Sequence, residues 1–365
     1  MCLIQTLQSK LVLLPALVLL GGLCHAQTTG YIAGAKSLTS FDSSTGAIIN
    51  AFSNGGDDTQ FAVAGDDSTL YIPTNSLTSG TGTLNVVSGA SGQLLNSVAL
   101  PLGATKAILS SGGSTLYVLC PQSNRGFIYV IDVATLSITG TITFPEGTSP
   151  FDIALSPRST TLYVAVEGSV NKGEGCYLQG ICVFDAVTLA LTGHVERLFG
   201  YLGVSNDGNS LYVGNSIPGN PGRVRVVDTS TLAISAVPVN NPIFNGPIIS
   251  PLGHWAVLAG ETQTPSAMAY LVNTSTNKPV AEFLSSFPGN AGPAAVGDEV
   301  DGSAAFAPDG KSVWMLLSCV GFISPPSCST VDNAAVELVG FLFPSGEVIS
   351  TTPVSSDAGT IAFPR

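Results

Sequence analysis

Side chains of the kinds that perform catalysis are rare in this chain. Three of its 365 residues are histidines, and only His194 and His254 lie beyond the first 26 residues. His194 falls in the strand-like stretch LTGHVERLF and His254 in a short turn, so we expect the two rings to lie far apart. A zinc site built on histidines is therefore not expected. An activated serine needs a base close by, and no GxSxG, HExxH or phosphate-loop motif is present. The sequence therefore assigns no catalytic residue.

One acidic stretch has the chemistry of a calcium ligand set. The residues GDEVDG contain Asp298, Glu299 and Asp301, whose carboxylates are the hard oxygen ligands that Ca²⁺ prefers. The stretch lacks the length and the alternating ligand spacing of an EF-hand loop. A solvated acidic loop is the competing interpretation. Ca²⁺ at this loop is therefore left as an alternative, and no other metal or cofactor is predicted.

Five side chains between the expected strands have the chemistry of a binding surface. They are four aromatic rings and one cation: Tyr177, Arg197, Tyr201, Phe244 and Phe322. Aromatic residues and arginine are frequent anchors of protein interfaces. The alternative is that the rings cover the ends of an apolar core. The set predicts a site for a protein or glycan partner, at which the arginine could orient an anionic group.

The charge balance excludes two classes of partner. The chain has 12 Lys and Arg against 24 Asp and Glu, a formal net charge of −12. Nucleic acids and anionic membranes both require clustered basic side chains, so we expect neither as a partner. Beyond residue 26 there is no run of apolar residues long enough for a membrane span.

The first 26 residues have the organisation of a secretory signal peptide. Lys10 precedes the apolar run Leu11–Leu23, which is short for a membrane span, and a small residue precedes Gln27. Cys24 offers a lipoprotein alternative, although Leu23 is larger than the residue that usually precedes a lipidated cysteine. We therefore expect a secreted or periplasmic bacterial protein, and we expect it to be a monomer.

Export makes disulfide bonds an expected feature of the chain. Cys176 with Cys182, and Cys319 with Cys328, are the natural pairs because each closes a short loop. Each bridge would stabilise the fold by about 2–3 kcal/mol. Cys120 is left over at the end of the strand-like LYVLC, and we expect it to be a buried, inert thiol.

A repeated unit must position all of these side chains. The stretches VIDVATLSI, VFDAVTLAL and VVDTSTLAI begin at Val130, Val183 and Val226, and a strand of the LYV type precedes each one. Aligned positions recur along the chain at Asp42, Ser88, Asp132, Asp185, Asp228 and Asn273. Four short strands within a period of about 40–50 residues are typical of a β-propeller blade. The sequence therefore predicts an all-β propeller with antiparallel four-stranded blades.

The two ends of the chain together supply one more blade. Six units are complete, the N-terminal fragment lacks its innermost strand, and TIAFPR from Thr360 resembles that missing strand. The prediction is a seven-bladed ring closed by its C-terminal strand, which leaves no sheet edge open. Residues 27–365 are expected to form one domain, with blades at about 27–57 plus 360–365, 58–103, 104–149, 150–200, 201–242, 243–300 and 301–359.

One turn position varies between glycine and leucine. Leu136, Leu189 and Leu232 stand where Gly46 and Gly92 stand in other copies. A branched residue is costly at positive φ. The sequence therefore predicts that this position needs no left-handed residue.

Two segments carry a resemblance to a known family. SLYVGNS at Ser210, followed by VRVVDTSTLAI, and APDGKSVWM at Ala307 resemble the YVTN-family β-propeller repeat of bacterial secreted and surface proteins. The resemblance covers essentially the whole chain after residue 26 and is weakest in the last two blades, where Asn273 and FPSGE replace the Asp turn. It implies a fold and an extracytoplasmic location, and it carries over no catalytic positions.

Length variation points to one face of the expected ring. The loops between second and third strands, and the connections between blades, differ in length far more than the other turns. Binding usually resides on variable loops held by a rigid scaffold. We therefore predict a binding scaffold that engages a protein or glycan through this face. The alternative is a hydrolase similar to propeller lactonases, using carboxylates at the channel mouth with or without Ca²⁺.

Overall fold

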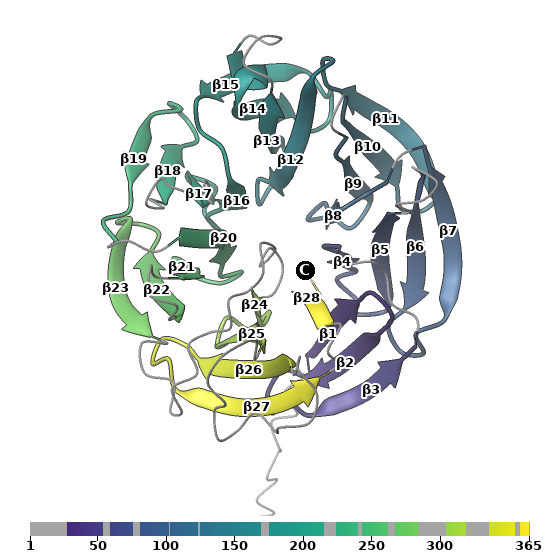
Figure 1. Ribbon diagram of the computed structural model, residues 1–365, viewed down its shortest axis with the longest axis vertical. Helices are drawn as coiled ribbons and strands as arrows, with labels where there is room; N and C mark the ends of the chain where they lie inside the picture. Colours follow the sequence, from purple (N-terminus) through teal and green to yellow (C-terminus); the bar gives the residue numbers. More distant parts are fainter. Residues whose placement is uncertain are drawn as a thin grey trace, which may run out of the picture.

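The chain folds into a closed ring of seven blades (Figure 1). The computed structural model describes residues 28–53, 59–75, 81–101, 103–122, 125–168, 175–214, 224–239, 243–261, 267–283, 304–318, 336–354 and 358–364. Within these residues the strands form seven four-stranded antiparallel sheets, each with one strand near the centre of the ring and one at the rim. The prediction of a seven-bladed all-β propeller is confirmed.

The first four blades have the following strands, from the innermost to the outermost. Blade 1 contains β28 (Ala358–Ala362), β1 (Thr29–Gly34), β2 (Leu38–Asp42) and β3 (Ile48–Phe52). Blade 2 contains β4 (Ala62–Val63), β5 (Thr69–Asn75), β6 (Gly82–Ser88) and β7 (Leu94–Leu100). Blade 3 contains β8 (Lys106–Leu109), β9 (Thr115–Cys120), β10 (Phe127–Asp132) and β11 (Ser137–Thr143). Blade 4 contains β12 (Thr148–Leu155), β13 (Thr161–Gly168), β14 (Gly180–Asp185) and β15 (Leu191–Glu196), with the short 3₁₀ helix η1 (Gly175–Leu178) between its second and third strands.

The last three blades follow the same order. Blade 5 contains β16 (Tyr201–Val204), β17 (Ser210–Gly214), β18 (Arg225–Asp228) and β19 (Ile234–Ala236). Blade 6 contains β20 (Ile243–Ile249), β21 (Trp255–Glu261), β22 (Ala267–Asn273) and β23 (Lys278–Phe283). Blade 7 contains β24 (Ala304–Phe306), β25 (Ser312–Ser318), β26 (Val336–Leu342) and β27 (Val348–Val354).

The C-terminal strand closes the ring as predicted. In β28, Thr360 pairs with Ala33 of β1, so the end of the chain becomes the innermost strand of the first blade. The Thr360 hydroxyl also donates a hydrogen bond to the carbonyl of Thr59, at the entrance to blade 2 (3.1 Å). Blade 1 is therefore built from both ends of the chain.

The apolar core lies between neighbouring blades. The leucine of each LYV-type strand, Leu70, Leu116, Leu162 or Leu211, is at most 1% exposed. Burying such a side chain stabilises the fold by about 1.5–3 kcal/mol. Each cluster of buried residues combines side chains from adjacent blades, as in the one that joins blades 3 and 4. The blades therefore hold together chiefly through packing on their faces.

The tyrosine of the LYV strand ties one blade to the next. The Tyr117 hydroxyl of blade 3 donates a hydrogen bond to the carbonyl of Ala186 in blade 4 (2.9 Å). The Tyr31 hydroxyl of blade 1 donates to the carbonyl of Asp67 in blade 2 (3.3 Å). Each tyrosine thus buries its ring between two blades and places its polar end on a partner.

The aspartate of the repeated DxxT-type turn has the role predicted for it. In blade 5 the carboxylate of Asp228 accepts hydrogen bonds from the backbone N–H groups of Ser230 (3.0 Å) and Thr231 (2.8 Å). The hydroxyl groups of Ser230 and Thr231 donate to the same carboxylate. Together with the two N–H groups, these hydrogen bonds lower the pKa of Asp228 to about 2. Asp228 is therefore a turn-forming residue.

The prediction for the leucine of this turn is wrong. Leu136, Leu189 and Leu232 all adopt left-handed backbone conformations, with φ of 54°, 60° and 60°. A left-handed residue other than glycine costs roughly 1–2 kcal/mol. The cost is offset by packing, because each leucine side chain lies against the apolar cluster shared with the preceding blade.

Candidate functional site

The two ends of the ring differ in their connections. Because each blade is antiparallel, its first-to-second and third-to-fourth turns lie at one end, which we call the tight-turn end. The second-to-third loops and the connections between blades lie at the other, which we call the loop-rich end. Arg197 and η1, which carries Tyr177, belong to the loop-rich end of blade 4. Tyr201 begins the innermost strand of blade 5 at the same end.

Arg197 and the η1 segment meet at one corner of blade 4. The disulfide between Cys176 and Cys182 joins η1 to β14, with the two Cα atoms 5.2 Å apart. This confirms the first of the two predicted bridges. The Arg197 N–H donates a hydrogen bond to the carbonyl of Gln179 (2.8 Å), which holds the connection to blade 5 against this segment. Arg197 is exposed and has a left-handed backbone, with φ of 57°.

Tyr177 packs into the core as much as it faces outward. Its ring lies edge-on to Phe144 with centroids 6.2 Å apart, and it contacts the cluster between blades 3 and 4. Burial raises the pKa of the Tyr177 hydroxyl. For this residue the structure favours the alternative interpretation, a ring that covers the end of the core.

Tyr201 belongs to an aromatic cluster on the other side of blade 4. The ring of Phe151 lies 4.5 Å from that of Phe199 and 4.8 Å from that of Tyr201, measured between centroids. Phe151 is the extra residue of a β-bulge, because Pro150 and Asp152 pair with consecutive residues of β13. Bulges re-aim side chains next to functional sites. Tyr201 itself is 9% exposed, whereas Phe151 and Phe199 are half-buried.

Several predicted residues lie outside the described part of the chain. They are Phe322, Asp298, Glu299, Asp301, Cys319 and Cys328. Phe244 lies in β20, and its side chain is also outside what the structure describes. The binding role, the Ca²⁺ alternative and the second disulfide assigned to these residues therefore stay predictions.

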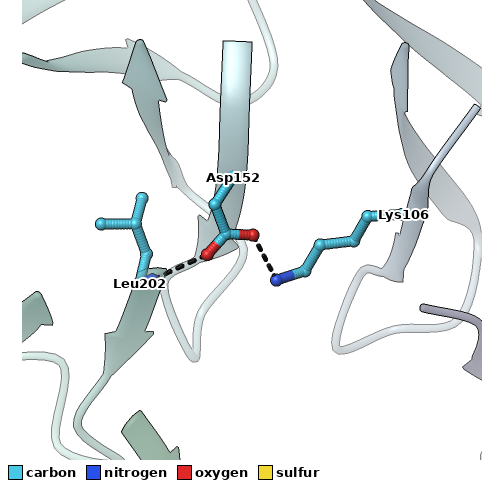
Figure 2. Close-up of polar contacts among 3 residues, drawn as sticks. All are labelled: Lys106, Asp152 and Leu202. Atoms are coloured by element: carbon cyan, nitrogen blue, oxygen red, sulfur yellow. Dashed lines mark hydrogen bonds and ion pairs between the residues drawn. The ribbon is translucent and has the colours of Figure 1, made fainter. Parts of the chain in front are cut away.

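A buried ion pair, which the sequence patterns did not lead us to expect, links three innermost strands (Figure 2). The Nζ of Lys106 in β8 lies 2.5 Å from Oδ1 of Asp152 in β12. The other carboxylate oxygen of Asp152 accepts the backbone N–H of Leu202 in β16 (2.7 Å). The side chains of Lys106 and Asp152 are 13% and 1% exposed. One carboxylate thus connects blades 3, 4 and 5.

The two charges occupy equivalent positions of the repeat. Lys106 and Asp152 each lie three residues before the inner-strand residue that pairs with the leucine of the LYV strand. Gln60 and Thr360 hold the same position in blades 2 and 1. The carbonyl of Gln60 accepts the N–H of Ala107 (2.8 Å), which continues the series of contacts into blade 3. Polar contacts at one level of the inner strands therefore run from blade 1 to blade 5.

The contacts of Asp152 indicate a structural role and not a catalytic one. Both of its oxygens are engaged, and the carboxylate is shielded from solvent. A general base must reach the proton that it removes, and this carboxylate faces protein on both sides (Figure 2). Leaving one charge of a buried pair without its partner costs about 3–5 kcal/mol. The arrangement therefore fixes blade positions beneath the loop-rich end.

A usable signal for this pair was present in the sequence. Most inner-strand positions of the repeat are apolar, and a lysine and an aspartate stand one blade period apart in KAILS and DIALS. Opposite charges at one repeat position in adjacent blades predict contact across the blade boundary.

His194 and Cys120 lie where the sequence predicts them. His194 lies on the outermost strand β15, about half exposed, with Nε2 3.6 Å from Oε1 of Glu196. Cys120 is a buried free thiol, and burial raises its pKa to about 12. Among the described residues, no three His, Cys, Asp or Glu side chains gather where they could share a metal ion. The described residues also include no helix long and apolar enough to cross a membrane.

Known proteins resemble this chain in fold. No protein-family profile matches the sequence, and no curated protein does. A functionally unknown protein from Desulfotomaculum acetoxidans superposes with a TM-score of 0.62 at 16% identity, over 92% of this chain and 98% of that one. Hydrazine synthase of Kuenenia stuttgartiensis gives 0.60 at 16% identity over 88% and 90%. The dihydro-heme d1 dehydrogenase NirN in complex with DHE gives 0.61 at 12% over 93% and 75%. At these identities the likeness shows the fold alone, that of a seven-bladed β-propeller.

Proposed function

We propose that this protein is a secreted or periplasmic binding scaffold that engages a protein or glycan partner at its loop-rich end, around blades 4 and 5. The observation that carries the proposal is the aromatic cluster of Phe151, Phe199 and Tyr201. Aromatic rings are typical anchors of a binding interface, and those of Phe151 and Phe199 are half-buried. The exposed cation of Arg197 stands at the start of the same blade connection.

Preorganisation supports the same proposal. The Cys176–Cys182 bridge and the backbone contact between Arg197 and Gln179 restrain this corner before any partner arrives. Binding to a restrained surface loses less conformational entropy than binding to a free loop. A disulfide is also typical of extracytoplasmic proteins, which agrees with the proposed location.

The experiment compares matched variants at the two ends of the ring. Phe199→Ala and Arg197→Asn change the loop-rich end, and asparagine tolerates the left-handed backbone at position 197. Lys278→Asn removes an exposed cation at the tight-turn end and serves as the control. Wild type and variants are tested on a glycan array and in affinity capture from cell-envelope extracts. Tyr201→Ala is a poor test, because this buried residue would leave a cavity.

The expected result is loss of one defined partner from both loop-rich variants, with no loss from Lys278→Asn. Circular dichroism and thermal unfolding confirm that each variant is folded. Equal capture by all four proteins would contradict the proposal.

The lactonase alternative has no support among the described residues. Of the inner-strand residues that the structure describes, Asp152 is the one carboxylate, and its oxygens are already bonded to Lys106 and Leu202. We therefore do not advance it as a second function.

A further inference from the structure

One tyrosine departs from the pattern that ties blade to blade. At the tight-turn end Tyr31 and Tyr117 each donate to a carbonyl of the next blade, and Tyr212 donates to Oδ1 of Asn277. Tyr71 occupies the equivalent position in blade 2 and is 5% exposed. Within the described part of the chain its hydroxyl makes no hydrogen bond to the protein, although it is not one of the fully buried polar atoms, and the residue lines a cavity.

The cavity lies between blades 2 and 3 and has a volume of about 250 Å³. Its apolar wall includes Ala64, Leu109 and Val133, and its polar wall includes Asp66 and Tyr71. Drug-sized ligands usually occupy about 300–1,000 Å³. This site is therefore of a size for one small group and not for an extended ligand.

Two consecutive glycines explain why the space is open. The turn of blade 3 reads SGGST, and a Cβ added to Gly112 or Gly113 would meet nothing within 4 Å. In blade 4 the equivalent turn places Ser159, whose hydroxyl accepts the N–H of Ser111 (2.7 Å) and fills the corresponding interface. Blade 3 has glycine at this position and supplies no such side chain. The space beside Tyr71, between blades 2 and 3, therefore stays unfilled.

The polar wall carries a negative charge. Oδ1 of Asp66 accepts hydrogen bonds from the N–H (3.1 Å) and hydroxyl (2.7 Å) of Ser68, and these bonds lower the pKa of the carboxyl. Asp66 is therefore ionised at neutral pH, and Oδ2 is not used by these bonds. Burial, and after it the negative charge of Asp66, raises the pKa of Tyr71. Both groups line the cavity, Asp66 as an exposed residue at its edge and Tyr71 as a buried one.

From this geometry we infer that the cavity binds an alkylammonium group, with its charge at Asp66, one N–H donated to the Tyr71 hydroxyl, and its carbon chain along Leu109 and Val133. A carboxylate and a phenol oxygen are acceptors that suit an ammonium donor. The apolar wall suits a short methylene chain. The formal net charge of −12 attracts cations to the surface as a whole.

The test uses n-butylammonium chloride as the probe and n-butanol as its neutral counterpart of similar shape. Binding to the whole protein is followed by saturation-transfer NMR and by thermal shift, with sodium chloride matching the ionic strength. We expect the ammonium to bind and the alcohol to bind at least about tenfold more weakly, a difference of about 1.4 kcal/mol. Equal binding of both probes would overturn the inference.

Three conservative variants locate the site. Asp66→Asn keeps the acceptor for Ser68 but removes the charge, and Tyr71→Phe removes only the hydroxyl. Both should weaken butylammonium binding several-fold. Tyr117→Phe is the matched control, because its hydroxyl is bonded to Ala186 and lies at a different interface; it should lower thermal stability and leave binding unchanged. Unchanged binding in Asp66→Asn and Tyr71→Phe would contradict the assignment.

The source of the ammonium group is identified with a second probe. Nα-acetyl-lysine methylamide presents the same group on a peptide backbone. Tighter binding than n-butylammonium assigns the site to a lysine side chain of a protein partner, and weaker binding assigns it to a free amine. The site lies at the end of the ring opposite the loop-rich surface, so Phe199→Ala and Arg197→Asn should not affect it.

Discussion

At the scale of single residues, the turn aspartates show how one side chain can serve a fold without serving chemistry. Asp132, Asp185 and Asp228 accept hydrogen bonds from hydroxyl and backbone N–H groups at the same turn of successive blades, and these bonds lower the pKa of each. Asn273 does the same in blade 6 without a charge, accepting the N–H of Ser275 (3.0 Å). The amide shows that the turn needs the acceptor oxygen and that the charge adds pH dependence.

This difference predicts how stability depends on pH. A carboxyl with a lowered folded-state pKa contributes stability that is present above its unfolded value, near 4, and is lost as the pH falls toward its folded value. For Asp228, whose folded-state pKa is about 2, that window lies between about pH 4 and about pH 2. We expect the melting temperature to fall across this window. The triple variant Asp132→Asn, Asp185→Asn, Asp228→Asn should fold at neutral pH and show a shallower fall, measured by calorimetry. Identical slopes would contradict this explanation.

The Lys106–Asp152 pair predicts a strong coupling between two residues. Lys106→Met should destabilise the fold by about 3–5 kcal/mol, because it leaves a buried carboxylate unpaired. Asp152→Asn should do the same to the ammonium. The double variant removes both charges and keeps an acceptor for the Leu202 N–H, so it should lose much less than the sum of the two. Unfolding in guanidinium chloride measures the free energy of unfolding of the wild type, the two single variants and the double variant, which together form a double-mutant cycle. Lys278→Met, at an exposed site, is the control. Additive losses would show that the pair is not coupled.

At the scale of elements, neighbouring blades fit together because a large side chain on one blade lies opposite a glycine on the other. Leu189 and Leu232 project onto Gly140 and Gly193 in the outer strands of the preceding blades. At Gly92 the arrangement is reversed, because a Cβ there would overlap the ring of Phe52. A large residue on one side is thus matched by glycine on the other.

This pairing predicts the outcome of a size exchange. Gly92→Leu should destabilise the ring by about 1–3 kcal/mol from overpacking, in addition to the left-handed backbone cost. Adding Phe52→Ala should recover part of that loss, because the new leucine occupies the vacated space. Gly113→Leu is the control: its φ is 70° and nothing lies within 4 Å of its Cβ position, so it carries the backbone cost without the clash. The free energy of unfolding is measured for each variant. If adding Phe52→Ala recovers none of the stability lost in Gly92→Leu, the proposed pairing is contradicted.

At the scale of the whole molecule, the repeated sequence predicts the features that all blades share but not the contacts that are specific to one pair of blades. The period, the DxxT-type turns and the stray TIAFPR segment were sufficient for the ring, its seven blades and its closure. The left-handed leucines were missed because their cost is local, whereas the compensating contact belongs to another blade. The contact between Lys106 and Asp152 could have been predicted from their shared repeat position. The cavity at Tyr71 could not, because the sequence does not show which hydroxyl lacks a partner.

The pairing of β28 with β1 also has a consequence for the time at which the ring can form. Thr360 and Thr59, which share a hydrogen bond, are separated by 301 positions in the chain. Contacts between residues so distant in sequence form slowly. Blade 1 can acquire its innermost strand only after the ribosome has released β28, so the nascent chain stays an open arc until residues 358–362 have emerged.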